Sequence, residues 1–269
     1  MTTALSSAEL NRFRKHLTSC PILNVRVDSL SEFMAAISSA ITTNDMFWFR
    51  GHADLSWKLT PSALRYAEPA QRARALKLIA EFKRIAEIKL PRPPRPDEEL
   101  MWAQLAQHYG LPTRLLDWTE SATVALYFSC LKPDQDGLMI MLNPIDLNRL
   151  SYPKLPRILD PQADREIILA YLRLGPNEKK NGRFPVAMNP VWNSERLMLQ
   201  RGVFTLHGSR LTLTGKGVPS LVALPILREY KERLRAELQR VGVDELTLFP
   251  ELEHSCLHLK RRAGLKGWD

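Results

Sequence analysis

Three short segments constrain this chain most, because each places charged or polar residues among apolar residues that are expected to be buried. They lie at residues 47–52, 108–119 and 200–204. A buried guanidinium or carboxylate is costly unless it is paired or serves a ligand. Three such segments in one chain therefore predict a fold that brings them together at a site.

The size and charge of the chain limit the classes of fold and partner. With 269 residues, of which 45% are hydrophobic, the chain can bury the core of one large domain. Its formal net charge of +9 favours anionic partners such as nucleotides, nucleic acid or acidic proteins. Cationic runs such as residues 72–74 and 260–262 are interpreted either as solvated helix faces or as a binding patch.

The cysteines and the hydropathy pattern bear on the compartment. Three widely spaced cysteines show neither zinc-ligand spacing nor an even number for disulfides. The N-terminus has no signal-peptide pattern, and no run of about 18 apolar residues predicts a membrane span. We therefore expect a reduced, cytoplasmic protein with no metal and no membrane contact.

Hydrophobic periodicity predicts intermixed helices and strands. Helices are expected over residues 7–17, 30–41, 70–89, 97–108, 121–129, 163–173, 194–200 and 226–240. Strands are expected over residues 22–27, 46–49, 113–116, 137–142, 184–188 and 203–206. The expected helix N-caps are Ser7, Ser29, Asp97, Asn193 and Asp244. Without regular βαβ alternation, the pattern predicts an α+β fold with a mixed sheet and additional helices at both ends.

Arg50 is the first candidate site residue. It is expected at the end of an aromatic strand and is followed by Gly51, which lets a ligand or another backbone approach closely. The planar fork of an arginine suits phosphate or carboxylate, because it binds two oxygens at once. The alternative is a structural ion pair with Asp117 or another carboxylate, and the spacing favours neither.

The second segment supplies more candidates. Strand alternation places Arg114 on one face and Asp117 on the other. Asp117 and Thr119 then lie at a strand end just before a helix, where functional residues are common. The alternative is that one of them caps this helix, which leaves Arg114 and Trp118 without a role.

The remaining candidates are weaker. A lone histidine such as His108, near a helix C-terminus, is more often structural. Gln200 places an amide beside Gly202, and Glu195 in a first helical turn is ordinarily a surface residue. Phosphate-loop, dinucleotide, zinc-protease and serine-hydrolase motifs are missing, and no adjacent carboxylate cluster supports a Mg²⁺ nuclease.

Together these residues resemble the FRG domain family, which is named for an aromatic-Arg-Gly signature. The resemblance rests on residues 49–51, 57–62, 106–119, 124–128, 200–205 and 248–252. It implies one domain over residues 44–262, with an N-terminal extension over 1–43 that packs on it and a tail over 263–269.

The chain is also similar, more distantly, to ADP-ribosyltransferases of the Arg-Ser-Glu type. Aligning residues 124–128 on the family's Val-Ala-x-x-Phe helix puts residues 117–119 on its Ser-Thr-Ser strand end. The resemblance implies that Arg50 holds the NAD pyrophosphate or ribose. A catalytic glutamate is expected a few residues before the Arg-Gly at 201–202, where Glu195 is near the spacing and Gln200 fits the FRG pattern. Asp117 is the alternative carboxylate.

These resemblances imply a site and a function. The implied catalytic residues are Arg50, Asp117, Thr119, Glu195 and Gln200, and the implied NAD contacts are Arg50, Gly51, His108, Arg114, Trp118 and Thr119. The leading expectation is NAD binding with transfer of ADP-ribose to a macromolecule, for which nucleic acid is a candidate acceptor, in a toxin or phage-defence setting. The alternative is a non-catalytic module that binds nucleic acid or protein through its basic surface.

Overall fold

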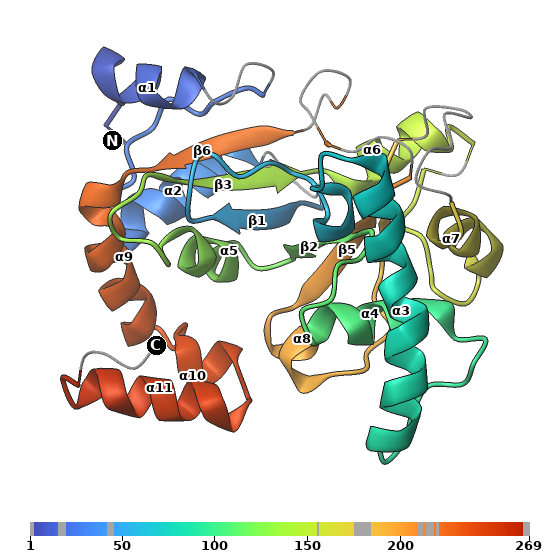
Figure 1. Ribbon diagram of the computed structural model, residues 1–269. Coiled ribbons are helices and arrows are strands. Elements are labelled where there is room, and N and C mark those ends of the chain that lie inside the picture. The colour runs from blue at the N-terminus through green and yellow to red at the C-terminus, as the bar shows by residue number, and fades with distance from the viewer. Residues whose placement is uncertain are drawn as a thin grey trace.

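The computed structural model describes residues 3–15, 20–41, 46–154, 156–174, 184–208, 212–213, 218 and 221–265. Its centre is a six-stranded sheet with the order β4-β5-β2-β1-β3-β6, in which all neighbouring strands are antiparallel (Figure 1). The strands are β1 (Trp48–His52), β2 (Leu115–Thr119), β3 (Gly137–Leu142), β4 (Val186–Met188), β5 (Gly202–Leu206) and β6 (Val222–Ile226). The α+β class is confirmed, and the strand pairing is antiparallel where a mixed sheet was expected.

Helices flank the sheet and extend the fold at both ends of the chain (Figure 1). They are α1 (Ser7–Arg14), α2 (Leu30–Ala40), α3 (Pro69–Lys89), α4 (Glu99–His108), α5 (Ala122–Ser129), α6 (Pro144–Ser151), α7 (Arg165–Leu172), α8 (Glu195–Leu199), α9 (Arg228–Arg240), α10 (Glu245–Leu248) and α11 (Leu252–Arg262), with a 3-10 turn η1 (Ser62–Leu64). Within the described residues, none of these helices is both long enough and apolar enough to cross a membrane.

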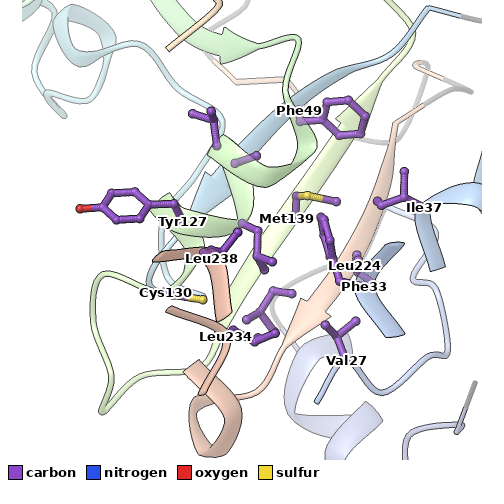
Figure 2. Packing of buried hydrophobic residues seen from close by; sticks show 14 of the residues in the cluster. Val27, Phe33, Ile37, Phe49, Tyr127, Cys130, Met139, Leu224, Leu234 and Leu238 are labelled. Atoms are coloured by element: carbon purple, nitrogen blue, oxygen red, sulfur yellow. The ribbon is translucent and has the colours of Figure 1, made fainter. Parts of the chain in front are cut away.

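The centre of the sheet is buried on both faces. On one face, Met139 of β3 packs with Phe33 of α2 and Leu234 of α9 (Figure 2). Met141 of β3 belongs to the same cluster. On the other face, the alternate residues of β3 join a second cluster, which includes Phe13 of α1. Because successive side chains of a strand point to opposite faces, a doubly buried strand is a continuous apolar run. This is why the sequence predicts residues 137–142 with the observed bounds.

Several expected elements differ in the structure. Residues 22–27 do not form a strand of the sheet; Ile22 makes only an isolated bridge to Ala223. The elements β6, α6 and α11 were not predicted. The proline-rich stretch 91–96 connects α3 to α4 without regular helix or strand, as expected.

Two of the predicted helix caps are confirmed and three are wrong. Ser29 caps α2, and Asp244 forms a capping box with Thr247 at α10. The N-cap positions of α1, α4 and α8 are Ser6, Glu98 and Ser194, each one residue away from the expected Ser7, Asp97 and Asn193. Such shifts are within the usual uncertainty of helix ends read from sequence.

A fully buried lysine joins α9 to the loops that follow β1 and α5. The Nζ atom of Lys231 donates hydrogen bonds to the main-chain oxygens of Ala53 and Lys132, each at 2.9 Å. Burial lowers the pKa of Lys231, and nearby Asp136 and Asp134 oppose this shift. The two carbonyls satisfy an ammonium that would otherwise be costly to bury.

Candidate functional site

A cleft of about 380 Å³ opens between the β1–β2 pair and helices α4, α5 and α8. Phe49 of β1 lies opposite Thr119 of β2, so the first two segments singled out in the sequence meet at this point. The third segment, residues 200–204, forms the end of α8 and the start of β5. It lies at the cleft because β5 pairs with β2. The predicted residues that line the cleft are Arg50, Gly51, His108, Asp117, Trp118, Thr119 and Gln200.

Arg50 is held in a fixed orientation on the cleft wall. Its Nε atom donates to Nε2 of His52 at 3.1 Å, and its Nη1 atom donates to the main-chain oxygen of Asp117. The Asp117 carboxylate lies farther away, at 3.8 Å from Nη1, and its side chain is 64% exposed. No described residue accepts a hydrogen bond from Nη2 of Arg50. The ion pair is therefore present but leaves part of the guanidinium available to a ligand.

His52 is the group that orients Arg50 from behind. Its side chain is buried, and burial together with the positive charges of Arg50 and Arg65 lowers the pKa of His52 to about 3. Because Nε2 accepts the hydrogen bond from Arg50, the neutral ring carries its proton on Nδ1. Trp57 packs edge-on against this ring, with the ring centroids 5.9 Å apart.

Replacing His52 with glutamine is expected to change how stability depends on pH. The pKa of His52 falls from 6.5 to about 3 on folding, so the stability that its neutral form contributes is complete above 6.5 and lost as the pH falls toward about 3. His52→Gln keeps an acceptor for Arg50 but does not titrate. The unfolding free energy of the variant should therefore rise relative to wild type as the pH falls through this window. Denaturant titrations at successive pH values measure this, and parallel profiles would contradict it.

Asp117 lies on the cleft side of β2, and a chain of two side-chain hydrogen bonds orients its carboxylate. Its Oδ1 atom accepts a hydrogen bond from Nε2 of Gln107 at 2.6 Å. Gln107 in turn accepts a hydrogen bond from the hydroxyl of Thr113. Gln107 lies in the segment 106–119 that resembles the FRG domain, but the sequence does not predict it as a site residue, since its role depends on the last turn of α4 lying beside β2.

Thr119 and Gln200 connect the strands to the walls of the cleft. The hydroxyl of Thr119 donates to the main-chain oxygen of Gln200 at 2.7 Å and accepts from the amide of Ser121 at 3.0 Å. Ser121, not Asp117 or Thr119, is the N-cap of α5. The side-chain amide of Gln200 donates to the main-chain oxygen of Leu248 at 3.1 Å. Thr119 and Gln200 therefore line the cleft, and their hydrogen bonds also hold β2, the end of α8 and the C-terminal segment together.

His108 belongs to a charged group at the α8 side of the cleft. Its Nε2 atom lies 3.9 Å from a carboxylate oxygen of Glu251, and Arg196 lies 3.7 Å from the same oxygen. Burial and the charge of Arg196 lower the pKa of His108, while Glu251 raises it. Arg196 also lies over the ring of Phe249 at 4.6 Å. These contacts join α4 and α8 to the C-terminal segment.

The structure does not bring two predicted residues into the cleft. Arg114 is buried, and its guanidinium donates to the main-chain oxygens of His207, Gly208 and Leu174. It therefore stabilises the chain at the start of β2 and does not line the cleft. Glu195 is exposed in the first turn of α8 and does not line the cleft, although its neighbours Ser194 and Arg196 do.

Two further predicted residues, Trp118 and Gly51, line the cleft, and their described contacts are with the protein itself. Trp118 forms part of the wall, and its indole nitrogen donates to the hydroxyl of Thr205 at 3.0 Å. A Cβ atom added to Gly51 would lie 2.0 Å from the main-chain oxygen of Ala125. The backbone that approaches Gly51 is therefore helix α5. Among the described residues, no group of three metal-ligating side chains is assembled.

The resemblance to the FRG domain is confirmed for the part of the chain that contains the first four motif segments, residues 49–51, 57–62, 106–119 and 124–128. The family model described as the FRG domain matches residues 45–137. Over these residues the chain is similar to the FRG domain. The matched residues supply Arg50, Asp117 and Thr119 to the cleft, whereas α8 and Gln200 lie outside them. Neither curated proteins nor solved structures give a significant match to the chain.

Proposed function

We propose that the cleft binds NAD or a related nucleotide, and that the protein transfers ADP-ribose to a macromolecular acceptor. The observation that carries this proposal is Arg50, whose Nη2 has no described hydrogen-bond partner at the cleft wall. A guanidinium in this state suits a phosphate or pyrophosphate. The apolar side chains of Phe49, Val124 and Phe128 line the same cleft and suit the planar ring of a base or nicotinamide.

Asp117 is the carboxylate that we assign to the transfer. In the proposed reaction, the bond between nicotinamide and C1′ of its ribose breaks, and nicotinamide leaves with the bonding electrons. The acceptor oxygen or nitrogen forms the new bond to C1′ and loses its proton to Asp117. Among the described residues that line the cleft, Asp117 is the only acidic one, so it also stabilises the positive charge that develops on the ribose.

Replacing Arg50 with alanine is expected to abolish NAD binding. Loss of a charged, bidentate contact to phosphate should weaken binding by at least about a hundredfold. Calorimetric titration of NAD into wild type and Arg50→Ala measures this. Arg149→Ala is the matched control, because Arg149 makes only a surface ion pair with Asp146 on α6. Retained binding in a folded Arg50→Ala variant would overturn the proposal.

Labelled NAD identifies the acceptor class. Transfer of label to RNA, DNA or protein by wild type, and its loss in Arg50→Ala, would establish the enzyme and its acceptor. Binding without transfer would instead indicate a nucleotide-sensing site. A toxin or phage-defence role belongs to this same proposal, because it depends on the transfer.

The second candidate function is a module that binds nucleic acid or protein without catalysis. The observation that favours it is the basic surface, since the formal net charge is +9 and several cations of α3 make no ion pair with a described carboxylate. Binding of nucleic acid that falls steeply with salt and does not depend on Arg50 would favour this candidate over the enzyme.

A further inference from the structure

A second hollow, of about 550 Å³, lies beside the cleft and shares Arg50 and Trp57 with it. Its other cations are Lys58 in the loop after β1, Arg65 at the end of η1 and Arg72 in the first turns of α3. We call this hollow the basic pocket. None of its described lining residues is acidic, whereas the cleft contains Asp117.

Three of the four cations of the basic pocket have no described carboxylate as an ion-pair partner, whereas Arg50 lies 3.8 Å from the Asp117 carboxylate. In the described part of the chain, no carboxylate lies within ion-pair distance of Lys58, Arg65 or Arg72. Burial lowers the pKa of Arg50 and of His52, and the charge of Arg65 lowers both further, although Asp117 opposes the shift at Arg50. Because His52 is neutral, the charge repulsion in the pocket is between Arg65 and Arg50. An anion in the pocket would relieve this repulsion.

Two of the guanidinium groups are held in place by main-chain oxygens. The Nε atom of Arg65 donates to Thr60 at 2.9 Å. One Nη atom of Arg72 donates to Tyr66 at 2.7 Å and to Ala67 at 2.6 Å. No described residue accepts a hydrogen bond from the Nη atoms of Arg65. The pocket thus presents oriented donors, and donors that are ordered before binding cost less entropy when a ligand arrives.

We propose that the basic pocket is a phosphate-binding subsite, joined through Arg50 to the nucleotide cleft of the proposed function on which it rests. Phosphate is the chemistry that a cluster of arginine forks and a lysine recognises. The phosphate belongs either to a nucleotide whose base lies in the cleft or to a nucleic-acid strand that runs past it. Trp57 and Tyr66 are 45% and 42% exposed, so they offer stacking surfaces to bases of such a strand.

Pyrophosphate, which lacks a base, is the probe that isolates this subsite. Calorimetric titration of pyrophosphate into the full chain is expected to show binding that weakens about tenfold in the double variant Lys58→Gln, Arg65→Gln. Arg240→Gln is the matched control, because Arg240 is an exposed cation at the end of α9. Lys58→Gln alone should weaken binding in the same direction, and its side chain makes no hydrogen bond to a described residue.

Two more ligands separate the sources of the phosphate. If the double variant binds NAD more weakly than wild type, the phosphate in the subsite belongs to the nucleotide. If the double variant binds an oligothymidylate more weakly but binds NAD as wild type does, the phosphate belongs to a nucleic-acid strand. The subsite proposal would be overturned if wild type did not bind pyrophosphate, or if wild type and both variants bound it equally. This would hold even if NAD bound through Arg50. Pyrophosphate binding that the variants weaken, without any NAD binding, would support the subsite and overturn the proposed function.

Discussion

Gly51→Ala is expected to destabilise the protein by about 3 kcal/mol, at the upper end of the cost of forcing extra atoms into a packed interior. The added Cβ atom would lie 2.0 Å from the main-chain oxygen of Ala125 and 2.6 Å from the amide of Ser129. Both are backbone atoms of helix α5, so no side-chain rotation relieves the contact. Strand β1 and α5 must therefore separate, and Arg50 moves with the strand. Denaturant unfolding of both proteins measures the loss.

Gly242→Ala is the control that separates packing from backbone freedom. Gly242 has a φ of +79°, and a Cβ atom added there would meet nothing within 4 Å. Its replacement should cost only the strain of the left-handed conformation, about 1 kcal/mol. If the two substitutions reduced the unfolding free energy equally, the close approach of β1 to α5 would not explain the glycine in the aromatic-Arg-Gly motif.

Local sequence patterns predicted the class of the fold and its central elements, but non-local pairing set the strand ends. The apolar run before Arg50 suggested a strand that ends at Phe49. In the structure β1 continues to His52, because residues 48–52 pair along β3 from Leu142 back to Leu138. Arg50 therefore lies within a strand of the sheet, where hydrogen bonds to neighbouring side and main chains fix its orientation.

Strand β6 illustrates a pattern that the sequence concealed. Its residues include Pro225, which argues against a strand in the interior of a sheet. The structure places β6 at the edge of the sheet, next to β3 alone among the named strands, where a missing amide donor is tolerated. The sequence pattern predicts Ile226 as the start of the following helix, whereas α9 begins at Arg228.

The candidate site was only partly predictable. A charged residue in a sequence does not show whether its side chain will bind a ligand or the protein's own main chain. Arg50 and Arg114 are both predicted to contact NAD, yet the guanidinium of Arg114 donates hydrogen bonds to three main-chain oxygens. Gln107 gave no separate signal, and it reaches Asp117 only because α4 ends beside β2. The cations of the basic pocket likewise gather from a loop, a turn and a helix that only the fold brings together.

Under the proposed function, Asp117→Asn is expected to reduce ADP-ribose transfer roughly 10²- to 10⁴-fold, the range typical of a lost general base. NAD binding should stay close to wild type for two reasons. An asparagine oxygen can still accept the hydrogen bond from Gln107, and Arg50 donates to the main-chain oxygen of residue 117, which the substitution keeps. The measurements are the rate of labelled transfer under saturating NAD and calorimetric binding of NAD to the same preparation.

Glu195→Gln is the matched control for this test, because it removes the other carboxylate that the sequence offered. Glu195 is exposed and lies outside the cleft, whereas Asp117 lines it beside Arg50. Transfer should therefore be unchanged in Glu195→Gln. If Glu195→Gln lost transfer and Asp117→Asn kept it, α8 would have to turn toward the cleft during the reaction. The carboxylate of Asp117 would then serve only to orient its neighbours on β1 and α4.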